Sequence, residues 1–130
     1  MKIEYILTVF FGGGIGAVLR YLLSFYTTSW LDPSFPLGTL IVNTLGSFII
    51  GFISYLSEVS IIPTSFRMFL MVGVIGGFTT FSTFSLENIN LLRDGEIKFF
   101  VLNIFLSVSL GLGAVVVGYV FGGLIMGRKV

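Results

Sequence analysis

Long runs without a charged residue constrain this chain more than any other feature. Three of them, Pro33–Ser57, Met68–Leu86 and Phe99–Gly127, each reach the roughly 20 residues that cross the hydrocarbon core of a bilayer. A fourth, Tyr5–Tyr26, is interrupted only by Arg20. The mean hydropathy is +1.07 and 10% of the residues are charged, against about 25% in an ordinary soluble domain. The sequence therefore predicts an all-α integral membrane protein with four transmembrane helices.

The predicted spans cover residues 5–26, 37–57, 68–92 and 98–126 within a single membrane domain, residues 1–130. So little chain remains outside the bilayer that any function has to lie within it. The chain has no cysteine and no histidine, which argues against thiolate metal sites, thiol catalysis and the commonest general base. We therefore expect a multi-pass protein of the cell membrane, in a bacterium the inner membrane, and not an enzyme.

The stretch Gly76–Phe84, with the sequence GGFTTFSTF, is poorly suited to the membrane helix in which it lies. Its two glycines remove side-chain support, and its four hydroxyl side chains can bond their own backbone. We therefore expect the third helix to be broken here, with carbonyl groups freed at the double glycine. Unwound backbone at this depth is tolerated only where protein buries it or where it lines a polar cavity. The stretch is thus a candidate ion or substrate site.

Span two has a polar face, because Thr39, Asn43 and Gly46 or Ser47 recur at spacings of three and four residues. An amide in the bilayer has to bond either a neighbouring helix or a permeating ion. An interhelical hydrogen bond is the simpler alternative for Asn43, but its alignment with Thr39 favours a polar pathway. On span four, Asn103 and Ser107 share a face in the same way.

Span one combines a face of small residues with one charge. Gly12, Gly13, Gly16 and Ala17 recur at the spacing that lets another helix approach closely, and we interpret them as packing residues. Arg20 would cost about 2.5 to 3.5 kcal/mol at the centre of a membrane helix. It is therefore expected either to snorkel to the interface or to face an aqueous vestibule, where it attracts anions.

Basic residues are nearly balanced across the membrane. An even number of spans places both termini on one side, and the two sides then carry similar sets: Lys2, Arg67, Arg128 and Lys129 against Arg20, Arg93 and Lys98. Since the Lys/Arg asymmetry of short loops sets orientation, such a chain is expected to insert both ways. Opposite insertion allows an antiparallel, dual-topology homodimer in which the broken third helices meet at the bilayer midplane and offer carbonyls to a cation.

Three pieces of sequence, in order, resemble the Fluc, or CrcB, family of fluoride channels over essentially the whole chain. They are GGIGA with Arg20-Tyr21 on span one, GTLIVN with GSF on span two, and GGFTTFSTFS on span three. The resemblance implies a fluoride-selective channel that exports fluoride passively and so gives resistance to it. It also implies an antiparallel homodimer in the lipid bilayer, with two pores, a central structural sodium ion and no nucleic-acid partner.

The resemblance implies roles for individual residues as well. Backbone carbonyls of Gly76 and Thr79 would hold the sodium ion. The residues of the ion pathway would be Asn43, Phe81, Phe84, Ser82, Thr83, Thr39 and Ser107, with Arg20 and Glu87 in the vestibule. Glu87 has the alternative of a solvated helix end. Gly111 stands where some members have a second hydroxyl, which leaves the far end of the polar track open.

The chemistry of fluoride fits these residue types. Fluoride is small, strongly hydrated and a strong hydrogen-bond acceptor, so a selective pore has to supply donors without a fixed cation that would trap the ion. Asn, Ser and Thr side chains supply donors. The edges of phenyl rings carry the positive part of the ring quadrupole, so Phe81 and Phe84 could coordinate an anion edge-on rather than serve only in packing.

Two other classes of protein were weighed against a channel. A small dual-topology, proton-coupled exporter of cationic drugs would have the same length and symmetry, but it needs a carboxylate embedded in the membrane. No Asp or Glu lies in the middle of span one or two. A passive assembly subunit held by glycine faces would leave Asn43 and the clustered hydroxyls unexplained.

Overall fold

The computed structural model describes residues 3–30, 34–59 and 62–127, and within these ranges the chain is helical apart from short turns, with no strand. Four stretches are long and apolar enough to cross a membrane: residues 3–27, 37–59, 64–93 and 97–125. The prediction of an all-α, multi-pass membrane protein with four spanning helices is therefore confirmed. The elements are α1 (Ile3–Trp30), α2 (Leu37–Val59), α3 (Thr64–Arg67), the π-helix η1 (Met68–Ile75), α4 (Gly76–Phe78), α5 (Phe81–Arg93) and α6 (Ile97–Ile125).

Several helices extend past the predicted spans. α1 continues to Trp30, beyond the predicted end at residue 26, and α2 continues to Val59, beyond residue 57. The third span, made of α3, η1, α4 and α5 and called the third run below, begins at Thr64 instead of residue 68. Of the basic residues used for the topology prediction, Lys2, Arg128 and Lys129 lie outside the described residues.

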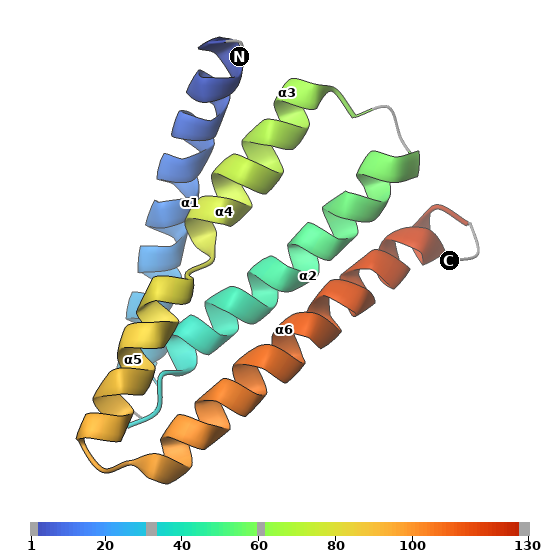
Figure 1. Ribbon diagram of the computed structural model, residues 1–130. Helices are drawn as coiled ribbons and strands as arrows, with labels where there is room; N and C mark the ends of the chain where they lie inside the picture. Colours follow the sequence, from blue (N-terminus) through green and yellow to red (C-terminus); the bar gives the residue numbers. More distant parts are fainter. Residues whose placement is uncertain (1–2, 31–33, 60–61, 128–130) are drawn as a thin grey trace.

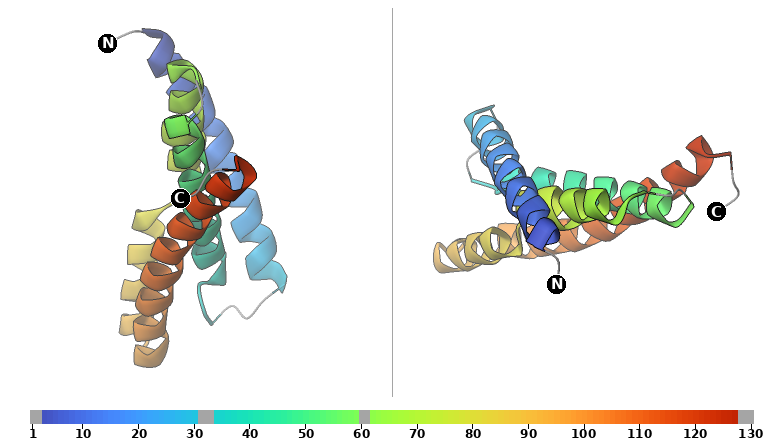
Figure 2. Two further views of the ribbon diagram at one scale, coloured as in Figure 1. Left: turned by 90° about the vertical axis from the view of Figure 1, so that its right-hand side faces the viewer. Right: turned by 90° about the horizontal axis from the view of Figure 1, so that it is seen from above.

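The helices form two pairs. α2 and α6 lie side by side, while α1 packs against η1 and α4 (Figure 1). Seen from above, α1 crosses the other helices at a wide angle (Figure 2). The start of α1 lies at the opposite end of the molecule from the turn between α5 and α6 (Figure 1). α5 contacts both α2 and α6.

Glycines allow the backbones of α1 and the first half of the third run to touch. A Cβ atom on Gly12 would lie 2.6 Å from the backbone oxygen of Phe69, and one on Gly16 would overlap the backbone oxygen of Val74. Real Cβ atoms do not approach other atoms so closely, so no larger residue fits at either position without moving a helix. The interpretation of Gly12 and Gly16 as packing residues is confirmed, whereas a Cβ on Gly13 would meet open space.

Glycines also allow the backbones of α2 and α6 to touch. A Cβ atom on Gly51 would overlap the backbone of Val115, and one on Gly118 would overlap the backbone of Phe48. Val42, on α2, is fully buried. α2 is therefore the central helix, and its residues contact both the third run and α6.

The third run is broken at Thr79 and Thr80, not at the double glycine. Gly76 has helical angles (φ −62°, ψ −36°), while Thr79 (φ −77°, ψ 157°) and Thr80 (φ −151°, ψ 119°) are extended. The break in the helix is confirmed, but its expected start at the glycines is wrong. Gly77 stays helical and provides close contact, because a Cβ there would lie 2.5 Å from the backbone oxygen of Gly13. A β-branched residue suits extended backbone, and Thr80 then serves as the N-cap of α5.

The turn after α5 is compact. The N–H of Glu96 donates to the carbonyl of Leu91 (2.9 Å) and the N–H of Gly95 donates to that of Leu92 (3.2 Å). This is a Schellman motif, and it requires the left-handed backbone that Gly95 supplies (φ 79°). The motif turns the chain back, so that α5 and α6 form an antiparallel hairpin.

Candidate functional site

Asn43 of α2 bonds both backbone groups of Thr80, in the break. Its Oδ1 accepts a hydrogen bond from the backbone N–H of Thr80 (2.8 Å), and its Nδ2 donates to the carbonyl of the same residue (3.0 Å). Because the first bond needs an acceptor and the second a donor, the pair fixes which way the amide faces. Asn43 therefore replaces helical partners that the break removes.

An interhelical hydrogen bond, the simpler alternative for Asn43, is thus present. The Nδ2 group of Asn43 carries two N–H donors, and only one of them takes part in the bond to Thr80. The other N–H can still serve an anion. Asn43 also lines a cavity of about 350 Å³ beside the break.

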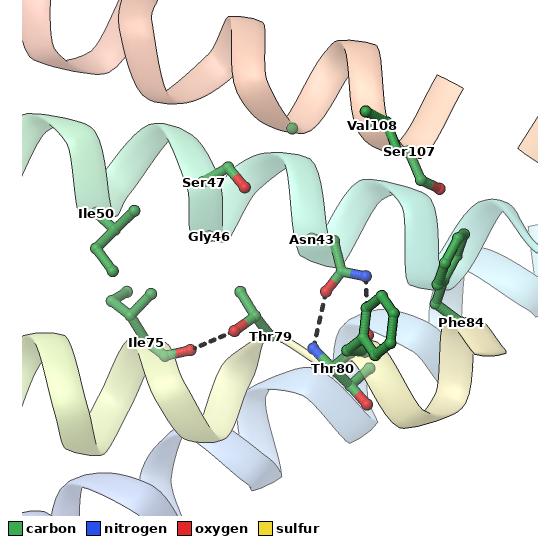
Figure 3. A pocket seen from close by; sticks show the side chains of 12 residues that line it. Asn43, Gly46, Ser47, Ile50, Ile75, Thr79, Thr80, Phe84, Ser107 and Val108 are labelled. Carbon is green, nitrogen blue, oxygen red and sulfur yellow. Dashed lines mark hydrogen bonds between the residues drawn. The ribbon is translucent and has the colours of Figure 1, made fainter. Parts of the chain in front are cut away.

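This inner cavity lies between α2, the break and α6 (Figure 3). Ser107 of α6 borders it across from Asn43 (Figure 3). The rings of Phe81 and Phe84 border it too, with centroids 5.5 Å apart and planes tilted by 44°. The side chain of Phe81 is 78% exposed in the single chain. The full lining consists of Asn43, Gly46, Ser47, Ile50, Ile75, Thr79, Thr80, Phe81, Phe84, Ser107, Val108 and Gly111.

A second, outer cavity of about 560 Å³ lies toward the turn between α5 and α6. Here the hydroxyl of Thr39 donates to Oε1 of Glu87 (2.6 Å), while Oε2 of Glu87 is buried without a hydrogen-bond partner. Asp94 and Glu96 also border this cavity, which makes its rim acidic. Its lining consists of Ser24, Ser34, Phe35, Pro36, Gly38, Thr39, Thr83, Glu87, Asn90, Leu91, Asp94 and Glu96.

The two cavities follow one another along the same face of α2. Thr39, in the outer cavity, is one helical turn from Asn43, in the inner cavity. Directly before α5, the hydroxyl of Thr80 links the two, because it accepts from the N–H of Thr83 (3.2 Å) and donates to the Thr83 hydroxyl (3.0 Å). Polar groups therefore continue from one cavity into the next.

The structure brings most of the predicted site residues to these cavities, but not all of them. Asn43, Thr79, Phe81, Phe84 and Ser107 border the inner cavity. Thr39, Thr83 and Glu87 border the outer one. Ser82, Arg20 and Gly76 border neither: Ser82 bonds the Thr80 hydroxyl (3.2 Å), Arg20 lies half-buried on α1, and Gly76 is exposed on α4.

Sequence reasoning missed Thr80, the residue on which Asn43 acts. Thr is a favoured N-cap residue, because its hydroxyl accepts from the backbone N–H two or three positions on, and this preference could have placed the start of a new helix after Thr80. Asn88 was also missed. It is 5% exposed, and its Nδ2 donates to the carbonyl of Phe84 (2.8 Å).

The break also frees backbone carbonyls. In a continuous helix the N–H of Thr80 would bond the carbonyl of Gly76, and that of Thr83 would bond Thr79. Both donors bond elsewhere, to Asn43 and to the Thr80 hydroxyl. The part of the chain that the structure describes has no cluster of three acidic, His or Cys side chains that could hold a metal, so the carbonyls are the groups of the break suited to a hard cation.

Comparison with known proteins gives a consistent result. The family model described as "CrcB-like protein, Camphor Resistance (CrcB)" matches residues 7–119. A protein of Hydrogenobaculum sp. (strain Y04AAS1), named fluoride-specific ion channel FluC, is 46% identical over 92% of this chain and 98% of its own length. Proteins of the same name from Magnetococcus marinus and Thermus thermophilus are 48% and 44% identical, over 88% and 98% of this chain and 94% and 100% of their own lengths.

Proposed function

This chain belongs to the CrcB family, and from that premise we propose that it forms a fluoride-selective channel through which fluoride leaves the cell passively. The related proteins are named as ion channels, and like them the chain is not an enzyme. The observation that carries the proposal is the inner cavity, where Asn43, Ser107 and the two phenyl rings meet beside broken backbone.

The ion pathway of the proposal runs from the outer cavity past Thr39 and Asn43 into the inner cavity. Thr83 and Asn43 offer donors along it, and no basic side chain borders either cavity. The absence of a fixed cation there suits rapid release of an anion. Glu87 stays in the proposal as the acidic group of the vestibule, held by Thr39.

The phenyl rings are the groups that distinguish this lining from an ordinary apolar one. Moving a carboxylate-sized ion into a low-dielectric interior costs on the order of 20 kcal/mol in the idealised limit, and the smaller fluoride ion costs more. Aliphatic side chains cannot offset this cost. Ring edges of Phe81 and Phe84 carry partial positive charge, and the two rings border the same cavity as the free N–H of Asn43.

A second copy of the chain completes the proposal. Phe81 is exposed in the single chain, and in three of the four spans less than a fifth of the most apolar 18-residue stretch is buried, 6% in α6. Antiparallel pairing would cover the break of each copy with that of the other. Gly76 and Thr79 of both copies would then hold the structural sodium ion with carbonyl oxygens, whose role is to neutralise the freed dipoles and join the two copies.

Ion flux tests the channel proposal directly. Liposomes loaded with fluoride and containing only this protein should release fluoride at a rate far above that of chloride-loaded liposomes. Protein-free liposomes provide the control. Equal release of both anions, or no release of fluoride, would contradict the proposal.

Topology tests the antiparallel pair. A tag on the C-terminus should be found on both sides of the membrane, since the basic residues are nearly balanced. Three lysines added to the turn between Arg93 and Lys98 should lock one orientation and abolish flux when that form is alone. Full activity from a single fixed orientation would exclude the antiparallel dimer.

Cation exchange tests the sodium site. The purified dimer should dissociate more readily when choline, which is too large for a carbonyl site, replaces sodium as the only monovalent cation. Potassium at the same ionic strength separates a specific effect from screening. Equal dissociation in all three salts would remove sodium from the proposal.

A further inference from the structure

Two buried amides lie outside the proposed ion pathway and have unsatisfied groups. Asn103 on α6 is 1% exposed and Asn88 on α5 is 5% exposed. Nδ2 of Asn103 and Oδ1 of Asn88 are buried without a hydrogen-bond partner. Such groups are rare in folded proteins and costly, so each asks for a reason. One is a donor and the other an acceptor, and the two are therefore complementary.

The hairpin of α5 and α6 brings the two amides to the same level. Phe84 on α5 and Ser107 on α6 border the same inner cavity. Asn88 follows Phe84 by one helical turn on α5, and Asn103 precedes Ser107 by one helical turn on α6. Both amides are therefore nearer than Phe84 and Ser107 to the loop that joins the two helices. The antiparallel register therefore places Asn88 opposite Asn103.

The hydroxyl of Ser107 donates to a side chain, that of Asn103, and not to the backbone of the preceding turn. Four other hydroxyl side chains in the described helices donate to the carbonyl four residues earlier, at 2.6 to 3.0 Å: Thr27, Ser57, Thr79 and Ser85. Ser107 instead donates to the side-chain Oδ1 of Asn103, at 3.4 Å. That distance is long for a hydroxyl donor, so the hydrogen bond from Ser107 to Asn103 is weak.

We infer that Asn103 is a positioning residue which keeps the Ser107 hydroxyl available as a hydrogen-bond donor to the permeating anion. Without Asn103, Ser107 would form the same bond to the preceding turn that the four other hydroxyls form. A hydroxyl that donates in that shorter bond is less available to donate a hydrogen bond to an anion. The inference rests on the proposed function, because it concerns the same inner cavity.

Asn88 favours one direction of the Asn103 amide. Its Nδ2 donates to the carbonyl of Phe84, so its Oδ1 is the group left toward α6. Oδ1 of Asn88 and Nδ2 of Asn103 are both buried without a hydrogen-bond partner, and Oδ1 of Asn103 accepts from Ser107. A reversed Asn103 amide would turn its oxygen toward Asn88, acceptor against acceptor, so the acceptor of Asn88 favours the direction in which Asn103 accepts from Ser107.

A double-mutant cycle tests the inference, with the fluoride concentration that gives half-maximal flux as the readout. Asn103→Leu should raise that concentration about fivefold, which corresponds to one ordinary hydrogen bond. In a Ser107→Ala background the same substitution should change it less than twofold, because no hydroxyl remains to position. Ser109→Ala is the matched control, since Ser109 lies on α6 but borders a different groove of α2 and α6.

Three outcomes would overturn the inference. If the effects of Asn103→Leu and Ser107→Ala multiply, Asn103 acts independently of Ser107 and is a packing residue. If Asn103→Leu does not assemble, Asn88→Leu replaces it in the cycle. If Asn88→Leu then raises the half-maximal fluoride concentration as much in the Ser107→Ala background as in the parent, the inference is again contradicted. A parent protein that conducts no fluoride would overturn the proposed function and this inference together, whereas a conducting parent with multiplying effects overturns only the inference.

Discussion

The two halves of the third run differ in how they contact the rest of the protein. The half before the break, η1 and α4, is apolar and rests its backbone against α1 through glycines. The half after it, α5, is rich in hydroxyl and amide groups that reach α2 and two cavities through side chains. Substitutions in the first contact should therefore change stability, and substitutions in the second should change conduction.

The largest effect is expected in the backbone contact. Gly16→Ala adds a methyl group that would overlap the backbone oxygen of Val74, so α1 has to move away from η1. We expect a loss of about 2 to 3 kcal/mol in the free energy of unfolding, measured by denaturation in detergent. Gly14→Ala, whose Cβ meets open space, is the control and should be neutral or slightly stabilising. Similar stabilities for both variants would show that the contact is not tight.

Asn43 lies where the two kinds of contact meet. Asn43→Ala leaves the N–H and carbonyl of Thr80 without their partner, and we expect a loss of about 1 to 3 kcal/mol in stability together with a large loss of fluoride flux. Asn43→Asp separates the two effects. Its carboxylate still accepts from the N–H of Thr80 but sets an acceptor against the Thr80 carbonyl and provides no donor, so it should conduct as poorly as Asn43→Ala although one of the two bonds is kept. Normal flux through Asn43→Asp would remove the amide donor from the pathway.

The ring pair should affect conduction alone. Phe81→Ile and Phe84→Ile keep apolar bulk but delete the positive ring edges, and each is expected to lower fluoride flux about tenfold, equivalent to about 1.4 kcal/mol. Stability should stay within about 1 kcal/mol. Phe10→Ile is the control, because Phe10 is 72% exposed on α1 and borders neither cavity. If both ring variants conduct like the parent, the rings only pack.

The smallest effect is expected at the cap of α5. Thr80→Ala removes the oxygen that accepts from the N–H of Thr83, and the loss of an N-cap costs about 1 kcal/mol. Thr80→Ser keeps that oxygen and should restore most of the stability in the same denaturation measurement. A serine variant as unstable as the alanine variant would mean that the methyl group of Thr80, and not its hydroxyl, matters.

Much of the site could be read from residue type and spacing. Thr39 and Asn43 share a face of α2 because helical periodicity is a local property, and both reach the cavities. The break was expected from its two glycines together with its hydroxyl residues. Its position was not, because Gly76 and Gly77 are compatible with both helix and unwound backbone, and in the structure this segment stays helical with Gly77 in close contact with α1.

The sequence by itself determined that the chain is a four-helix membrane protein, because the length of an uncharged run and its transfer into lipid depend on composition alone. Only the tertiary structure decided which groups meet. Asn43 bonds Thr80, and Thr39 bonds Glu87. Both bonds depend on the rotation of each helix against its neighbours, and that rotation is set by glycine contacts between distant segments.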